Sequence, residues 1–206
     1  MEIVATIAAT MGIAWASGIN LYAALFMLGW MGSTGSIDLP PDLEILQSPL
    51  VMVAAGFMYC VEFFADKIPG VDNLWDALHS FIRIPAGALL GAGMVSAISP
   101  EMELVGLLLG GTLAAGTHFT KAGTRVLVNT SPEPFSNIAV SVGEDALVVA
   151  GLWASLHHPI LFIIALVLAI AFVIWMIPKI WRGVKRVFAR IRGWFGGTAT
   201  DTGPTT

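Results

Sequence analysis

The chain has 206 residues, of which 56% are hydrophobic and only 12% are charged, and its formal net charge is −4. Soluble domains are about 25% charged, so this composition predicts a polytopic membrane protein and argues against a soluble enzyme or a nucleic-acid-binding domain. Cys60 is the only cysteine, which excludes an internal disulfide and a cysteine-ligated metal site.

Apolar segments long enough to cross a bilayer recur along the chain. A transmembrane helix needs about 20 mainly apolar residues, or somewhat fewer where protein covers it. We therefore predict an all-α fold with six transmembrane helices in one domain over residues 1–178. The first segment lacks the basic start of a signal peptide, so we expect it to be retained. The six segments are residues 3–31, 49–66, 84–99, 103–121, 136–156 and 159–178.

The basic residues predict the orientation of these segments. All ten lysines and arginines lie between the second and third segments, between the fourth and fifth, or after the sixth. The positive-inside rule places these basic parts in the cytoplasm. An even number of spans puts both termini on the same side. We therefore predict a multi-pass protein of the inner (plasma) membrane with both termini cytoplasmic.

The end of the chain is strongly basic. Residues 179–195 alternate basic and apolar side chains at helical spacing directly after the last span. This pattern predicts an amphipathic interfacial helix that binds anionic lipid, rather than a nucleic-acid-binding segment. We expect residues 196–206 to be disordered.

A second amphipathic helix is predicted between the second and third spans, over residues 71–83. Its polar residues Asp72, Asp76, His79 and Arg83 fall on one face. We expect this face to be solvated on the cytoplasmic surface. The alternative is that it lines the inner mouth of a transport pathway.

Short motifs recur in the two halves of the chain. "ASGINLYAA" in the first span and "AAGTHFTKA" in the fourth align Asn20 with His118. A Ser-Pro dipeptide opens the second and fifth spans, and Glu62 and Asp145 each follow its proline by 13 residues. Three spans per half would make the halves antiparallel, so we predict a 3+3 inverted repeat, as in many secondary transporters. The two halves are roughly residues 1–99 and 103–178.

Glycines occur where helices would either loosen or pack closely. Gly18 and Gly116 lie two residues before Asn20 and His118, where a loosened helix could expose backbone carbonyls beside a ligand. Plain helix packing is an equally strong alternative. Two glycine pairs at a spacing of four predict close helix contact elsewhere: Gly87 with Gly91, and Gly106 with Gly110.

Acidic residues interrupt two of the apolar segments. Glu144 lies eight residues into the fifth span, about 12 Å at helical rise, and Asp145 is beside it. A carboxylate at that depth costs about 2.5–3.5 kcal/mol, so we expect a partner, a proton or a function. Glu62 and Asp66 share a face near the inner end of the second span. A structural ion pair, or simple proximity to the interface, is the alternative for both pairs.

Basic residues share a face at the inner end of the fourth span. His118, Lys121 and Arg125 would either bind an anionic group or neutralise the carboxylates of the second and fifth spans. We favour neutralisation. Arg83 is a further candidate for charge compensation or anion binding.

Five stretches carry a family resemblance: "ASGINLYA", "SPLVMVAAGFMYCVEFFADKIPGVDNLWD", "IRIPAGALLGA", "HFTKAGTRVLVNTSPEPFSN" and "VGEDALVVAG". Through them, most of residues 12–155 resembles a family of bacterial membrane proteins catalogued as domain of unknown function 4126. This resemblance implies an integral membrane protein and no particular chemistry. "EFFADK" is also similar to the Glu-x-Gly-Asp-Lys motif of cation/proton exchangers, with one extra residue and Ala in place of Gly.

The leading functional prediction is a small secondary transporter, not an enzyme, that moves a cation or protons through a carboxylate-lined site between the two halves. No cofactor is expected, no metal is assigned, and a homo-oligomer is compatible with the sequence. One alternative is a non-transporting membrane protein that organises lipid or a partner. The other is a lipid-phosphate translocator that uses the basic face of the fourth span. The candidate ion-coupling residues are Glu62, Asp66, Glu144, Asp145, Asn20 and His118; the charge-compensating or anion-binding residues are Lys121, Arg125 and Arg83.

Overall fold

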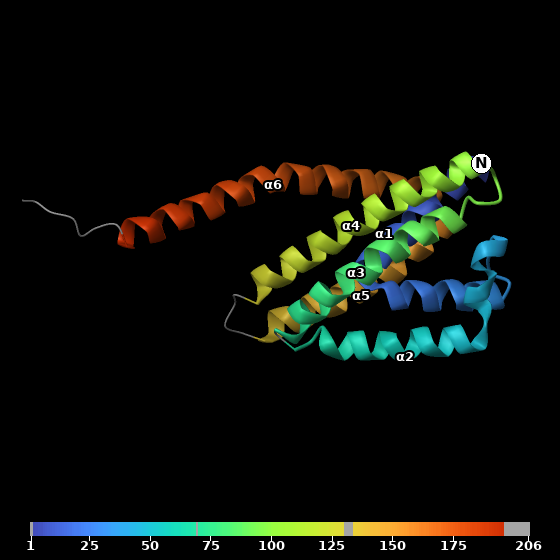
Figure 1. Cartoon of the computed structure of the whole chain (residues 1–206), viewed down its shortest axis with the longest axis horizontal. Helices are drawn as coiled ribbons and strands as arrows, with labels where there is room; N and C mark the ends of the chain where they lie inside the picture. Colours follow the sequence, from blue (N-terminus) through green and yellow to red (C-terminus); the bar gives the residue numbers. More distant parts are fainter. Residues whose placement is uncertain (1, 69, 130–133, 196–206) are drawn as a thin grey trace, which may run out of the picture. The chain divides into compact units, whose positions relative to one another are not determined.

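A computed structural model of the chain describes residues 2–68, 70–129 and 134–195; the side chains of Pro134, Ile177 and residues 179–195 lie outside the described part. The described residues form helices and no strand, which confirms the predicted all-α class (Figure 1). Two compact units, residues 1–164 and 165–206, make up the chain. The elements are α1 (Glu2–Ser33), the 3-10 helix η1 (Pro41–Gln47), α2 (Pro49–Ala65), α3 (Val71–Gly93), α4 (Pro100–Val128), α5 (Pro134–His157) and α6 (Pro159–Phe195).

Several helices have the length and composition of membrane spans. Among the described residues, four helices qualify, and η1 with α2 would make a fifth if this pair, bent by 69°, forms one span. These helices support a membrane protein, but their number, four or five, is lower than the six spans predicted. The predicted span 84–99 does not qualify, because most of it belongs to α3, a helix with a charged face. The four qualifying helices are Glu2–Ser33, Pro100–Val128, Phe135–His157 and Pro159–Met176.

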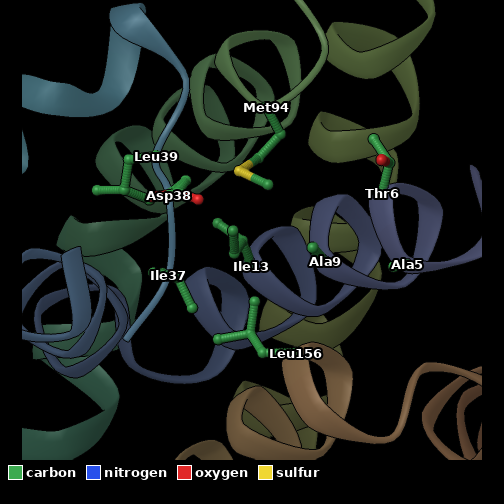
Figure 2. Close-up of a pocket in the computed structure, with 9 residues that line it drawn as sticks. All are labelled: Ala5, Thr6, Ala9, Ile13, Ile37, Asp38, Leu39, Met94 and Leu156. Carbon is green, nitrogen blue, oxygen red and sulfur yellow. The ribbon is translucent and has the colours of Figure 1, made fainter. Parts of the chain in front are cut away.

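Helix α1 doubles back on itself near its middle. A straight helix would separate Thr6 from Gly32 by about 39 Å. Both residues instead lie near Leu39. Thr6 lines a cavity of about 180 Å³ together with Leu39 (Figure 2), and a Cβ atom on Gly32 would lie 2.8 Å from the Leu39 side chain. The segment predicted as the first span, residues 3–31, therefore consists of two half-helices that meet near its middle.

The reversal of α1 occurs at Asn20, whose backbone is extended (φ −144°, ψ 96°). The Asn20 side-chain Oδ1 accepts a hydrogen bond from the Ala23 N–H over 3.0 Å. Asn20 is thus the N-cap of the second half-helix, because an N-cap side chain bonds the N–H three residues on. The loosened helix predicted beside Gly18 is present, although Gly18 also packs closely, since a Cβ atom there would overlap the Ala114 carbonyl oxygen. The same prediction beside Gly116 is wrong, because α4 continues as one helix through His118.

The turn in α1 also removes the basis for the predicted position of the N-terminus. Both ends of α1 lie at the end of the first unit that contains the α3–α4 connection (Figure 1). The basic connection between α2 and α3 lies at the opposite end. The prediction that both termini share the side of the basic connections rested on a straight first span, and this premise no longer holds.

Helix α3 is continuous from Val71 to Gly93 and merges the predicted surface helix 71–83 with most of the predicted span 84–99. Its polar stripe (Asp72, Asp76, His79 and Arg83) is at most 7% exposed, whereas Phe81 on the opposite face is 83% exposed. The expected solvated polar face is therefore wrong. The charges face the protein interior and the apolar side chains face outward, the arrangement expected of a helix among other helices in lipid.

Helices α3 and α4 pack with their backbones in close approach. A Cβ atom on Gly91 would overlap the Gly106 carbonyl oxygen, and a Cβ atom on Gly110 would lie 2.5 Å from the Gly87 carbonyl oxygen. The predicted contact through these four glycines is confirmed. Gly116 differs from them, because no atom would lie within 4 Å of its Cβ atom.

The predicted last span and basic helix form one uninterrupted helix, α6, which continues through Pro178 to Phe195. The amphipathic character predicted for residues 179–195 depends on side chains outside the described part. The predicted disordered tail, residues 196–206, also lies outside the described residues.

Candidate functional site

A cluster of charged side chains lies buried where the C-terminal end of α2 and the N-terminal half of α5 meet α3 and α4. Glu62 lies on the buried face of α2, and Asp66 is the C-cap of that helix. Asp76 and Arg83 come from the inward stripe of α3, where their spacing of seven residues places them two turns apart on one face. We call the following seven residues the charge cluster: Glu62, Asp66, Asp76, Arg83, Lys121, Arg125 and Glu144.

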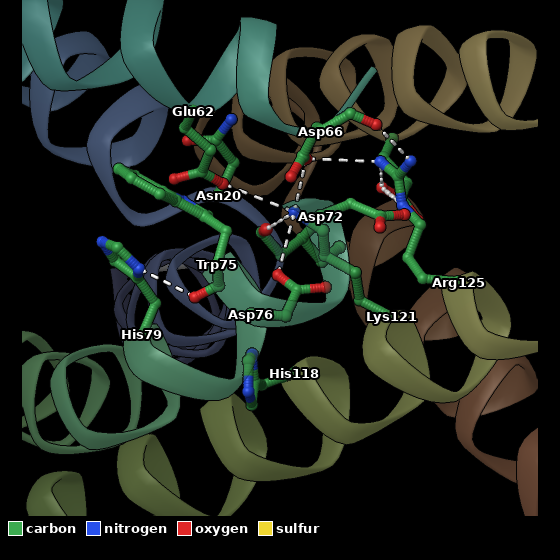
Figure 3. Close-up of polar contacts among 12 residues, drawn as sticks. Asn20, Glu62, Asp66, Asp72, Trp75, Asp76, His79, His118, Lys121 and Arg125 are labelled. Atoms are coloured by element: carbon green, nitrogen blue, oxygen red, sulfur yellow. Dashed lines mark hydrogen bonds and ion pairs between the residues drawn. The ribbon is translucent and has the colours of Figure 1, made fainter. Parts of the chain in front are cut away.

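Lys121 lies at the centre of the charge cluster (Figure 3). Its Nζ is 2.7 Å from Asp66 Oδ2, 3.4 Å from Glu62 Oε1 and 3.6 Å from Asp76 Oδ1. It also donates a hydrogen bond to the Ile19 carbonyl oxygen over 3.0 Å. That carbonyl lies at the break in α1, so the ammonium joins α1 to three carboxylates.

Arg83 joins α2 to α3. Its Nη2 is 2.6 Å from Glu62 Oε1, and its Nη1 is 2.8 Å from Asp76 Oδ1, with side chains that are 0–2% exposed. Arg83 Nη1 is also 3.3 Å from His118 Nδ1, and the other nitrogen of that ring, Nε2, is 2.6 Å from the Ser80 hydroxyl. His118 therefore lies at the edge of the charge cluster, in polar contact with α3 and with the backbone of Gly18 in α1.

Arg125 joins α4 to α2 and α5. Its Nη2 is 2.6 Å from Glu144 Oε2 and 3.2 Å from Asp66 Oδ2. Its Nη1 donates to Asn137 Oδ1 over 2.8 Å and to the Asp66 carbonyl oxygen over 2.9 Å. The favoured expectation, that Lys121 and Arg125 neutralise the carboxylates of the second and fifth spans, agrees with these contacts.

The neighbouring acids of α5 point in different directions. Glu144 enters the charge cluster through Arg125. Asp145 accepts a hydrogen bond from Asn20 Nδ2 over 3.0 Å and lines a separate groove beside α1. Consecutive helical residues are rotated by about 100° around the helix axis, so Glu144 can face the protein interior while Asp145 faces the groove.

The charge cluster contains more acid than base. Its four carboxylates face three cations, which leaves one formal negative charge when all seven groups are ionised. Three buried carboxylate oxygens have no hydrogen-bond partner among the described residues. A buried charged oxygen without a partner is costly, so binding of one proton or one small cation would lower this cost. These three oxygens are Glu62 Oε2, Asp66 Oδ1 and Asp76 Oδ2.

A separate contact joins the start of α3 to the end of α4. Asn129 Nδ2 donates to both carboxylate oxygens of Asp72, over 3.0 and 2.8 Å. Asp72 Oδ1 also accepts from the Gly70 N–H over 2.8 Å. Gly70 has a φ of +89°, which suits glycine. Asp72 therefore holds the start of α3 to the end of α4.

The structure brings together most of the candidates named from the sequence. Glu62, Asp66, Glu144, Lys121, Arg125 and Arg83 are in the charge cluster, His118 is at its edge, and Asn20 and Asp145 form an adjacent pair. Asp76 is the one member of the charge cluster not among these candidates, because its position in the polar stripe of α3 was interpreted as a solvated face. The spacing of the α3 polar stripe was the available signal, since it fits an inward face equally well. Among the described residues, no group of three His, Cys, Asp or Glu side chains is arranged to hold a metal ion.

Comparison with known proteins gave one match. Searches of curated proteins and of solved structures found no similar protein. The family described as "Domain of unknown function (DUF4126)" matches residues 7–179, a range that includes the broken α1, the inward stripe of α3 and the whole charge cluster. The chain belongs to this DUF4126 family.

Proposed function

We propose that this protein is a small secondary transporter in which the charge cluster binds and releases a proton. The observation that carries the proposal is the excess of buried acid: four carboxylates against three cations, with three carboxylate oxygens lacking described partners. A single proton shared among these acids would neutralise the excess charge and supply a hydrogen for a free oxygen.

The contacts favour a proton over the other ions considered. A divalent metal would need a group of acid or imidazole ligands that the described residues do not form. An anionic lipid headgroup would need free cations, but Lys121 and Arg125 are at most 4% exposed and bound to carboxylates. The lipid-phosphate translocator is therefore the weaker candidate.

The discontinuous helix α1 supports a transport role. Broken helices that expose backbone carbonyls beside charged groups are typical of transporter binding sites. The Ile19 carbonyl oxygen, which accepts from Lys121, has this position. We propose that a change in charge within the cluster alters this hydrogen bond and thereby the angle of the two half-helices.

The orientation in the membrane is part of the proposal. The basic connections between α2 and α3 and between α4 and α5 would lie in the cytoplasm, at the inner side of the plasma membrane. The doubled-back α1 would place the N-terminus on the other side, because its two halves together make no full crossing. The inverted repeat rests on the sequence alignment and on the acids near the inner ends of α2 and α5.

A non-transporting membrane protein is the second candidate, and one observation favours it. Each cation of the charge cluster contacts at least one carboxylate within 2.7 Å. Such a network would also fix four helices in one arrangement without moving any ion.

Proton flux into liposomes tests the proposal. The purified protein is reconstituted with a pH-sensitive dye inside, and flux is followed under a membrane potential alone and under gradients of sodium, magnesium or manganese. We expect flux above that of empty vesicles, and a loss of at least tenfold in Glu62→Gln. A signal equal to empty vesicles under every condition would overturn the transporter proposal.

The matched control separates transport from folding. Glu103→Gln changes an exposed acid of α4 and should leave flux unchanged. Thermal unfolding in detergent is measured for both variants. If Glu62→Gln loses flux only in proportion to lost folded protein, the charge cluster has a structural role.

A further inference from the structure

A lateral groove lies between the second half of α1, α2 and α5. Its volume is about 520 Å³, within the range of about 300–1,000 Å³ that is usual for small-molecule sites. Met27 comes from α1, Tyr59 from α2, and Asp145, Val149 and Trp153 from α5. Alanine and valine side chains of α5 complete the lining.

The groove combines apolar walls with one carboxylate. Asp145 is the only acidic or basic residue among those that line it. Asp145 Oδ1 accepts from Asn20, while Oδ2 is buried and has no partner in the described part of the chain. The apolar walls carry two aromatic side chains, Tyr59 and Trp153. Aromatic faces attract cations, most strongly where water is excluded.

We propose that this groove binds an amphiphilic organic cation, with its positive centre at Asp145 and its apolar body against Tyr59 and Trp153. Charge complementarity selects this occupant, since a buried carboxylate oxygen without a partner is stabilised by a cation and by neither an acyl chain nor an anion. The inference rests on the proposed function, because it names the substrate class that a proton-coupled transporter would carry.

The groove is connected to the charge cluster through the break in α1. Asp145 accepts from the Asn20 side chain, and the carbonyl of the preceding residue, Ile19, accepts from Lys121. A cation at Asp145 would compete with the Asn20 amide for the carboxylate. Release of Asn20 would loosen the break and weaken the Ile19 contact of Lys121. The proton and substrate sites therefore share one structural element, the break in α1.

Binding of tetraphenylphosphonium to the full-length protein in detergent tests the inference. Quenching of Trp153 fluorescence is not separable from that of the other tryptophans, so isothermal titration calorimetry is the primary readout. We expect saturable binding that weakens at least tenfold in Asp145→Asn. This variant can still accept a hydrogen bond from Asn20, so the fold should be retained.

Two controls make the result specific. Tetraphenylborate has the same shape and the opposite charge, and it should not bind saturably. Val149→Trp fills the groove and should abolish tetraphenylphosphonium binding without changing the charge. Glu103→Gln should bind like the unaltered protein.

Three results would overturn the inference: no binding of tetraphenylphosphonium, equal binding by Asp145→Asn, or equal binding of tetraphenylborate. The last two would indicate a groove for lipid acyl chains. Failure here is distinguishable from failure of the proposed function, because proton flux is measured in liposomes without the organic cation. Proton flux without tetraphenylphosphonium binding would support a proton-coupled transporter whose substrate is not an organic cation.

Discussion

Lys121 donates a hydrogen bond to the carbonyl oxygen of Ile19 over 3.0 Å, directly before the residue at which α1 reverses direction. A helix that breaks leaves carbonyl groups without their usual partners, and in a membrane each such group is costly. The same ammonium is 2.7 Å from Asp66 Oδ2. One side chain therefore satisfies the broken backbone and balances the buried acids.

Lys121→Met should destabilise the protein strongly. The change leaves buried carboxylates and the Ile19 carbonyl without their cation, and loss of one partner of a buried ion pair costs about 3–5 kcal/mol. Thermal or denaturant unfolding in detergent measures the effect. Lys67→Met is the matched control, because Lys67 is partly exposed and bonds the Phe63 carbonyl and the Ser141 hydroxyl. Equal loss of stability in both variants would contradict the central position of Lys121.

Asn20→Ala should lower the free energy of unfolding by about 1–3 kcal/mol. The alanine removes the N-cap of the second half-helix and the hydrogen bond to Asp145, each worth about 1 kcal/mol. Asn20→Asp should restore the cap but place a second carboxylate beside Asp145. Chemical denaturation of the two variants separates these contributions: a stability of Asn20→Asp equal to that of the unaltered protein would argue against the Asp145 contact.

Gly91→Ala should destabilise the α3–α4 contact by about 1–3 kcal/mol, as overpacking does in tightly packed interiors. The new methyl group would overlap the Gly106 carbonyl oxygen and lie 3.0 Å from Gly110 Cα, and neither backbone atom can move away alone. Gly116→Ala is the matched control, because its methyl group would contact no neighbouring helix. It should stabilise the helix by about 0.5–1 kcal/mol. A shift of the unfolding temperature in the same direction in both variants would contradict the close packing of α3 against α4.

The reversal of α1 predicts which positions are accessible from the same side of the membrane. In a Cys60→Ser background, single cysteines at Ile3 and Glu44 should react with an impermeant maleimide from one side. A cysteine at Ile68 should react only from the other side. All three positions are exposed. Reaction of the Ile3 and Ile68 positions from the same side would show that α1 crosses the membrane.

Several members of the charge cluster could be predicted from the sequence because isolated charges in apolar segments require partners. Glu62, Glu144, Lys121 and Arg125 each lie in or beside an apolar run, and the structure joins them. The expense of burying an ionised group makes such pairings a strong prediction even without knowledge of the fold.

The two errors in the fold have different physical causes. Hydropathy reports burial in apolar surroundings, and it does not distinguish one straight span from two half-spans that meet at Asn20. The polar stripe of α3 was assigned to water because Asp72, Asp76 and Arg83 are charged. The same periodicity also fits a helix whose charges face other helices and whose Leu78 and Phe81 face outward, and the structure has this arrangement.

The inward stripe of α3 has a consequence for synthesis of the protein at the membrane. Each charge in a helix costs about 2.5–3.5 kcal/mol at the bilayer centre on insertion scales, so α3 partitions poorly into lipid by itself. Glu62, the α2 partner of Arg83, leaves the ribosome before α3, but Lys121, which contacts Asp76, leaves after it. We therefore expect the newly made α3 to remain at the insertion machinery until α4 follows. The two helices would enter the bilayer together as a hairpin, with their glycine faces already in contact.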